Sequence, residues 1–227
     1  MSGWKRLLLA ACGGLCALAC HAAPDFGAER ASLDARYAAS WVVSGADNRK
    51  QPFAVVDKRD ARIYVFDAAG RLLGASPVLL GLTPGDFSAG TGRTAASLGV
   101  GERTTPAGRF VAEPGHNAQG VDIVWIDYDA AVSMHRVLTS NPQERRLERL
   151  RTRSVADNRI SYGCINLPVV FYERVLSPAV QAGTTIVYVL PETRPAASVF
   201  GFRGGSKSAA VPRRAADTLK VAGLDGA

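Results

Sequence analysis

Residues 159–168 of this chain read Arg-Ile-Ser-Tyr-Gly-Cys-Ile-Asn-Leu-Pro. The stretch places Cys164 after a glycine and close to a small serine, Ser161, which leaves room for a tight turn and for a substrate near the backbone. The backbone N–H groups of Tyr162, Gly163 and Cys164 are then candidates to face a developing oxyanion. A lone cysteine is either a nucleophile or a small buried hydrophobe, and its small neighbours favour the nucleophile.

Three of the four cysteines lie in the first twenty residues. The N-terminus is basic, the run Leu7–Ala19 is apolar but shorter than the roughly 20 residues of a membrane span, and small residues follow. This pattern predicts a secretory signal peptide over residues 1–23, with cleavage near Ala22 or Ala23. Lipoprotein processing at Cys20 is the less favoured alternative.

Signal cleavage leaves Cys164 as the single cysteine and His116 and His135 as the two histidines, and it lowers the formal net charge of +7 by two. A modest positive charge suits work near anionic wall polymers or membrane surfaces. The composition, 47% hydrophobic and 21% charged, is that of a globular protein. No nucleic-acid motif and no transmembrane segment is evident, so we expect a chain that is exported to the periplasm.

Beyond the signal peptide, the hydrophobic pattern divides the chain into three parts. Residues 24–51 are expected to form an N-terminal helical segment, residues 52–191 the catalytic domain, and residues 192–227 a flexible basic tail. In the helical segment, large apolar residues recur every four positions, which indicates an amphipathic helix. These residues are Leu33, Tyr37 and Trp41.

The central part is dominated by short β-prone runs. These runs are 53–56, 63–66, 72–80, 109–111, 121–126, 132–135 and 184–190. An exposed Arg-rich helix is expected over 142–153, a second helix over 169–176, and a long glycine-rich loop over 81–101. Parallel strand–helix–strand alternation is absent, so we predict a mainly β fold, a β-sandwich-like mixed sheet with a packed helix.

A thiol with a pKa of about 8.5 needs a base to become a good nucleophile. His116 lies in a Pro-Gly segment that is expected to be a hairpin loop. His135 ends the apolar run Val132–Met134, where a strand can fix its ring, so His135 is the preferred base for Cys164. The sequence after the signal peptide contains no close pair of metal ligands, and we expect no metal and no other cofactor.

The residues 161–166 resemble the Ser/Thr-His-Gly-Cys-apolar-Arg/Asn signature of L,D-transpeptidases with the YkuD-type catalytic domain. Residues 105–110 resemble the Thr-Pro-x-Gly-x-Phe segment of that family, and His135 takes the place of its catalytic histidine. The resemblance covers about residues 52–190 and implies a YkuD-like fold. It also implies acyl transfer on peptidoglycan stem peptides through a thioester on Cys164. The acceptor is then a second stem peptide, a wall-anchored lipoprotein, a D-amino acid or water.

Two features depart from the family pattern. Tyr162 replaces the second histidine of the signature, which keeps a catalytically silent wall-binding module as an alternative. The gap between His135 and Cys164 is longer, and it holds the Arg-rich segment 142–153. We interpret this segment as a solvated surface insertion in preference to a flap that binds substrate carboxylates. A murein carboxypeptidase or endopeptidase that uses the same site is the other alternative.

Further residues are candidates for supporting roles. Ser161, Tyr162 and Gly163 are candidates for orienting His135 or binding the oxyanion, and Thr105 is expected to shape a turn. The candidates for contacts with the stem peptide are Arg159, Asn166 and Met134.

Overall fold

A computed structural model describes residues 23–88 and 97–201 of the chain. The predicted signal peptide up to residue 22 and the predicted tail beyond residue 201 lie outside the described residues. The strands are β1 (Phe53–Asp57), β2 (Arg62–Phe66), β3 (Leu72–Pro77), β4 (Leu80–Gly81), β5 (Gly108–His116), β6 (Asp122–Asp127), β7 (Val132–Arg136), β8 (Arg159–Ser161), β9 (Ile165–Leu167) and β10 (Thr185–Val189).

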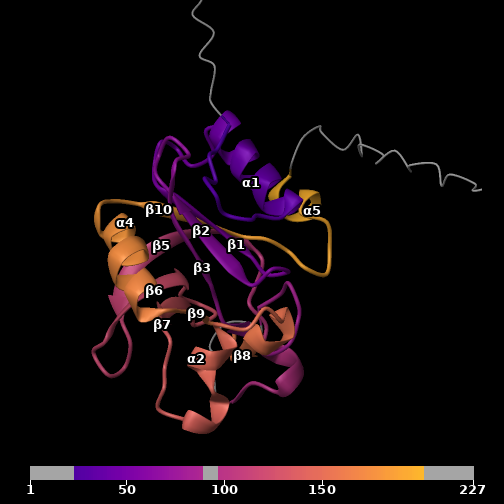
Figure 1. Cartoon of the computed structure of the whole chain (residues 1–227), viewed down its shortest axis with the longest axis vertical. Helices are drawn as coiled ribbons and strands as arrows, with labels where there is room; N and C mark the ends of the chain where they lie inside the picture. Colours follow the sequence, from indigo (N-terminus) through magenta and orange to yellow (C-terminus); the bar gives the residue numbers. More distant parts are fainter. Residues whose placement is uncertain (1–22, 89–96, 202–227) are drawn as a thin grey trace, which may run out of the picture.

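Short helices connect the strands. They are α1 (Leu33–Ser44), α2 (Arg146–Arg149), α3 (Val169–Phe171), α4 (Ser177–Gln181) and α5 (Ala197–Phe200), with 3-10 turns η2 (Val100–Glu102), η3 (Pro142–Glu144) and η4 (Val155–Asn158), and a π-helical turn η5 (Tyr172–Leu176). In Figure 1, α1 and α5 lie at one end of the long axis, and α2 and β8 lie at the other. No helix in the described part of the chain is long and apolar enough to cross a bilayer.

Eight strands form one mixed sheet in the order β3-β2-β1-β10-β5-β6-β7-β9, and β4 pairs with β8 in a separate two-stranded sheet. The strand β5 joins two halves of the large sheet, because its first part pairs with β10 and its second part with β6. The pairs β1–β10 and β7–β9 are parallel, and the other neighbours in this sheet are antiparallel. The predicted mainly β fold with a mixed sheet and few helices is therefore confirmed.

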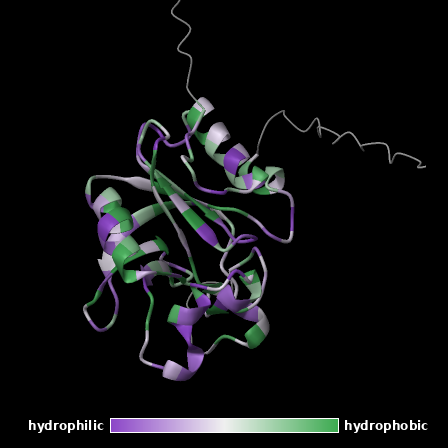
Figure 2. Cartoon of the chain, viewed as in Figure 1, coloured by the Kyte–Doolittle hydropathy of each residue, from purple (hydrophilic) through white to green (hydrophobic). Residues whose placement is uncertain are grey.

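The central strands are buried on both faces. In β1, Ala54 and Val56 face one hydrophobic cluster, which also includes residues of β6, β7 and β9 and of the helix formed by α3, η5 and α4. Phe53 and Val55 face a second cluster, which α1 covers. Strands enclosed in this way lose the alternation of polar and apolar residues. Figure 2 shows hydrophobic residues along these central strands and hydrophilic ones gathered around α2.

Helix α1 is present where the sequence predicts it, but the predicted buried face is wrong. Leu33 is 85% exposed and Tyr37 is 42% exposed. The buried residues are instead small, namely Ala35, Ala38, Ala39, Val42 and Val43. The sheet presents an aromatic layer beneath the helix, including Phe53, Tyr64, Phe66 and Tyr188, so small side chains are what allow close packing.

Other elements also differ from expectation. The Arg-rich segment is not one helix, since Arg145, with a φ of 50°, separates η3 from α2. The helix that begins at Val169 continues to Gln181 and contains a π-helical turn. This turn lies next to Pro178, which has no backbone N–H to donate to the preceding turn. His116, expected in a loop, ends β5 and pairs with Asp122.

The tight packing of α1 gives a test. We expect Ala39→Leu, at a fully buried position, to lower the free energy of unfolding by about 1–3 kcal/mol, because added methylenes strain a packed interface. Leu33→Ala is the control and should change it by less than about 0.5 kcal/mol. Urea unfolding measures both variants. An equal loss in the two would show that α1 does not pack through its alanines.

Candidate active site

Cys164 lies in the turn between β8 and β9, and the geometry of that turn requires glycine before it. Gly163 has a φ of +135°, and a Cβ at this position would come within 2.8 Å of the Thr104 carbonyl oxygen. The Ser161 hydroxyl donates to the Cys164 carbonyl oxygen at 2.6 Å and accepts from the Gly163 N–H at 3.1 Å. The turn is therefore closed by its own serine.

Thr105 holds the same turn from outside. Its buried hydroxyl accepts from the Gly81 N–H and donates to the Gly163 carbonyl oxygen, each at 2.9 Å. One side chain thus satisfies two buried backbone groups and fixes the cysteine turn against β4. This matches the shaping role expected for Thr105.

The thiol of Cys164 is half-buried and surrounded by polar groups of β7. The Ser133 hydroxyl donates to Sγ at 3.6 Å, and Sγ lies 3.7 Å from the carbonyl oxygen of Ala131. Burial acts to raise the pKa of the thiol. A hydrogen bond and the charge of His135, together with the Ser133 N–H and hydroxyl, outweigh burial and leave the pKa of Cys164 below its ordinary value. A lowered pKa raises the fraction of thiolate relative to that of an ordinary cysteine.

His135 is held on both ring nitrogens. Its Nδ1 lies 2.7 Å from the carbonyl oxygen of the next residue, Arg136, and its Nε2 lies 3.2 Å from Nδ2 of Asn166. The parallel register of β7 and β9 places His135 directly beside Asn166. Because a carbonyl oxygen only accepts, Nδ1 carries the ring proton of the neutral histidine, and Nε2 is the unprotonated nitrogen that can act as a base.

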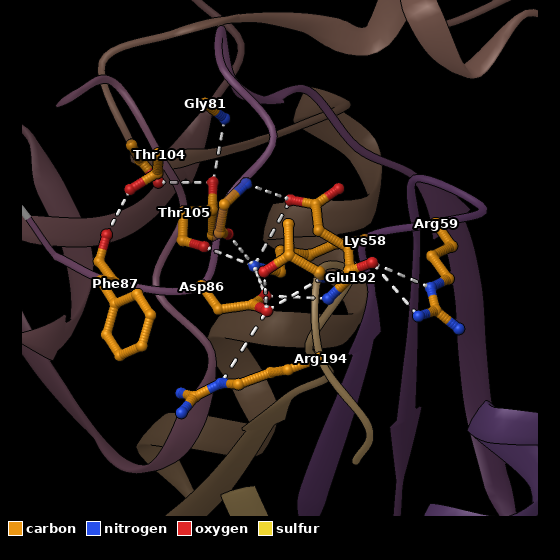
Figure 3. Close-up of polar contacts among 12 residues, drawn as sticks. Lys58, Arg59, Gly81, Asp86, Phe87, Thr104, Thr105, Glu192 and Arg194 are labelled. Carbon is orange, nitrogen blue, oxygen red and sulfur yellow. Dashed lines mark hydrogen bonds and ion pairs between the residues drawn. The ribbon is translucent and has the colours of Figure 1, made fainter. Parts of the chain in front are cut away.

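Next to the turn, Lys58 is paired with the buried carboxylates of Asp86 and Glu192 (Figure 3). Arg159 is the second cation of this buried cluster and pairs with the same Glu192. The ammonium of Lys58 lies 2.9 Å from Asp86, 3.4 Å from Glu192 and 2.7 Å from the carbonyl oxygen of Thr105. Arg159 donates to Glu192 at 2.5 Å and to the Lys58 carbonyl oxygen at 2.8 Å. Pairing of this kind is what makes buried charge tolerable.

The structure places several of the predicted site residues in contacts other than those expected from the sequence. Arg159, expected to contact substrate, is paired with Glu192, and its side chain is 9% exposed. Met134, also expected to contact substrate, is fully buried in the core. The hydrogen bonds of the Ser161 hydroxyl go to the turn and not to His135, and the Gly163 N–H is already used by Ser161.

Two further expectations change. Tyr162 is 42% exposed, and the Arg103 guanidinium lies 4.2 Å from its ring centroid, so the residue that replaces the family histidine is a cation–π partner. Glu192, which opens the predicted flexible tail, is instead fixed in the buried cluster, and its N–H donates to Asp86 at 2.8 Å.

Three contributors to the site were not predicted from the sequence. Ser133 contacts the thiol, and its position two residues before His135 on one strand could have revealed it, because alternate residues of a strand share a face. The Arg136 carbonyl oxygen and Arg146, described below, gave no such signal. Among the described residues, no group of three or more His, Cys, Asp or Glu side chains could hold a metal ion.

A cysteine whose thiol pKa is lowered by a nearby histidine, itself held by a carbonyl oxygen, is an arrangement used for covalent acyl transfer and hydrolysis. No family model and no curated protein matches the chain. Among solved structures, it is similar to the helical cell shape determining protein Pgp2 from Campylobacter jejuni, with 16% identity and a TM-score of 0.40 over 63% of this chain and 49% of that one.

Two further similar structures are named L,D-transpeptidases. For that of Enterococcus faecium the identity is 15% and the TM-score 0.34, over 62% of this chain and 50% of that one. For L,D-transpeptidase 1 of Mycobacterium tuberculosis the identity is 17% and the TM-score 0.33, over 61% of each chain. The chain thus spans about half to three fifths of the length of these proteins. At such identities the similarity concerns the fold, and the case for an activity depends on the side chains described above.

The Thr105 bridge yields a prediction. We expect Thr105→Val to lower the free energy of unfolding by about 1–3 kcal/mol, because it leaves the Gly81 N–H and the Gly163 carbonyl without their partner. Thr105→Ser keeps the hydroxyl and should lose clearly less. Denaturant unfolding of the two variants, measured beside the wild type, provides the comparison. Equal losses would show that the methyl group, not the bridge, is what matters.

The buried cluster predicts a dependence of stability on pH. Burial acts to raise the pKa of Asp86, but hydrogen bonds from Thr193, Lys58 and the backbone bring it well below the ordinary value of 3.8. A carboxyl whose pKa is lowered by folding stabilises the protein above its unfolded pKa, and this is lost as pH falls through the folded pKa. We therefore expect the urea midpoint to fall as pH drops below about 4. The fall should be shallower in Asp86→Asn, and an unchanged slope in that variant would contradict the assignment.

Proposed function

We propose that this chain is an exported cysteine acyltransferase that acts on peptidoglycan stem peptides as an L,D-transpeptidase. The observation that carries the proposal is the placement of Cys164 in a glycine turn against β7, the strand that holds His135 by its Nδ1 contact with a carbonyl oxygen. The neighbouring His135 also lowers the pKa of the thiol. The sequence signature around Cys164 supplies the substrate class, since it resembles that of L,D-transpeptidases. Cys164 is the nucleophile and His135 the general base.

In the first half-reaction, Nε2 of His135 takes the proton of Cys164, and Sγ attacks the carbonyl carbon of the residue before a terminal D-amino acid. The C–N bond breaks, the leaving amine takes the proton from His135, and a thioester remains on Cys164. The Arg136 carbonyl oxygen holds the ring through Nδ1 and stabilises the transient imidazolium.

The developing oxyanion needs hydrogen-bond donors. Since the Gly163 N–H is used within the turn, the donors are the backbone N–H groups of Cys164 and Tyr162, which have no hydrogen-bond partner among the described residues. The departure at Tyr162 is thus compatible with catalysis, because the backbone donor does not depend on the side chain.

In the second half-reaction, an acceptor amine attacks the thioester. The C–S bond breaks, a new amide forms, and the proton of the amine returns to Sγ through His135. The acceptor is a second stem peptide or a wall-anchored lipoprotein, and transfer to water would make the enzyme a murein peptidase. Export by a signal peptide over residues 1–23 places the enzyme in the periplasm beside this substrate.

The proposal predicts covalent labelling. One of the similar solved structures is L,D-transpeptidase 1 in complex with imipenem, and we expect this carbapenem to add its mass once to the present chain. Mass spectrometry should show no adduct in Cys164→Ala. In His135→Ala the rate should fall by about 10²–10⁴-fold, the usual contribution of a general base. His116→Ala, at the exposed end of β5, is the matched control and should react like the wild type.

Products from defined muropeptides complete the test. Cross-linked stems or exchanged D-amino acids support transpeptidation, and shortened stems alone would assign the same site to hydrolysis. Intact, reduced protein that neither binds imipenem covalently nor changes muropeptides would overturn the proposal.

A further inference from the structure

One arginine of the Arg-rich insertion reaches into the active site. Arg146, the first residue of α2, has a side chain that is only 10% exposed. Its Nη1 lies 2.5 Å from Oδ1 of Asn166, and its Nε lies 2.5 Å from a carboxylate oxygen of Glu144. Asn166 itself is 1% exposed. The sequence suggested a solvated surface insertion. The structure shows instead that one of its side chains is buried against a residue that contacts His135.

The other arginines of the insertion behave differently. Arg145 is exposed and pairs with Glu148, and Arg149 donates to the carbonyl oxygens of Glu144 and Asp157. Arg151 and Arg153 line an open cavity of about 840 Å³. Among the described arginines of this segment, Arg146 is the one that donates a hydrogen bond to Asn166.

A guanidinium donates hydrogen bonds and accepts none, so it fixes which end of the Asn166 amide faces it. The oxygen Oδ1 must point to Arg146, and the NH₂ group must point away. That group lies 3.2 Å from Nε2 of His135 and 3.4 Å from the Cys164 carbonyl oxygen. Each of these partners can accept, so the whole chain of contacts is consistent with one orientation of the amide.

The orientation of Asn166 in turn selects the tautomer of His135. An N–H directed at Nε2 requires a free lone pair on that nitrogen. The ring proton then sits on Nδ1, where it donates to the Arg136 carbonyl oxygen at 2.7 Å. If the amide turned over, its oxygen would face Nε2 and would favour a proton there. A ring protonated on Nε2 cannot accept the proton of Cys164.

We propose that Arg146 is a positioning residue, which fixes the amide of Asn166 and thereby keeps His135 in the tautomer with an unprotonated Nε2. This role rests on the proposed function, because the tautomer of His135 matters for reaction only if His135 is the base for Cys164. It also explains why a buried arginine from the connection between β7 and β8 contacts a residue of the cysteine motif.

The charges around His135 show that Arg146 acts through the hydrogen bond rather than through net charge. The carboxylate of Glu144 neutralises Arg146 directly. Arg136, on β7 beside His135, is paired with Asp122 and Glu173. Cys164, from the turn before β9, is then the remaining titratable group with a described interaction with the ring.

The test is the ring spectrum of His135 in the full chain, labelled with ¹⁵N on histidine, with its signals identified by comparison with His135→Ala. In the wild type we expect the Nδ1-protonated tautomer. In Arg146→Met we expect a shift toward protonation of Nε2, because Asn166 is free to turn over. Arg146→Lys keeps a donor and should retain the wild-type spectrum in large part. The signals of His116 report whether each variant is folded.

Arg145→Met is the matched control, because this neighbouring arginine is 69% exposed and its ion partner is Glu148. It should leave the His135 spectrum unchanged.

The rate of imipenem acylation should fall at least roughly tenfold in Arg146→Met, because the base is then misplaced, and stay within about twofold in Arg145→Met. A wild-type tautomer in folded Arg146→Met, or an equal shift in Arg145→Met, would overturn the role. The spectrum needs no reaction, so a wild type that does not react with imipenem would count against the proposed function alone.

Discussion

The buried ammonium of Lys58 is the point on which the arrangement around Cys164 depends. It follows directly on β1, and its partners come from three separate segments: Gly85 and Asp86, Thr105, and Glu192 beyond β10. Thr105 carries this anchoring one step further, since its hydroxyl binds Gly163 in the cysteine turn. A charge that cannot reach water must keep all its partners, so it fixes the relative positions of loops that share no strand pairing.

This anchoring explains how the thiol of Cys164 is held in place by few side chains. The turn around Cys164 is fixed by Ser161 and Thr105, and the ring of His135 by the Arg136 carbonyl oxygen and Asn166. Each member of the pair therefore sits on backbone that is itself fixed by strand pairing or by buried polar contacts. Groups placed in this way need little reorganisation before reaction, which is the general advantage of a preorganised site.

The sequence was sufficient for features that depend on local pattern. It gave the β-rich core, the presence of α1, the tight turn at Gly163 and the choice of His135 as the histidine beside Cys164. It was insufficient where a residue's environment is set by distant segments. The buried face of α1 consists of small residues because aromatic side chains of β1, β2 and β10 fill the space beneath it. The pairing of Arg159 with Glu192 and the contact of Arg146 with Asn166 join residues that no local pattern connects.

The position of β10 has a consequence for the order in which the molecule can form. It is the last strand of the described chain, yet it lies in the middle of the large sheet, between β1 and β5. Until it is made, β1 and β5 both have unpaired edges, and the strands β3-β2-β1 are not joined to β5-β6-β7-β9. Local hairpins such as β1–β2 can form early, whereas β1–β10 pairs Phe53 with Ile186 and closes a very long loop. The sheet is therefore completed late in synthesis, and we expect a chain cut short before β10 to hold two unjoined groups of strands rather than a slightly smaller version of the same sheet.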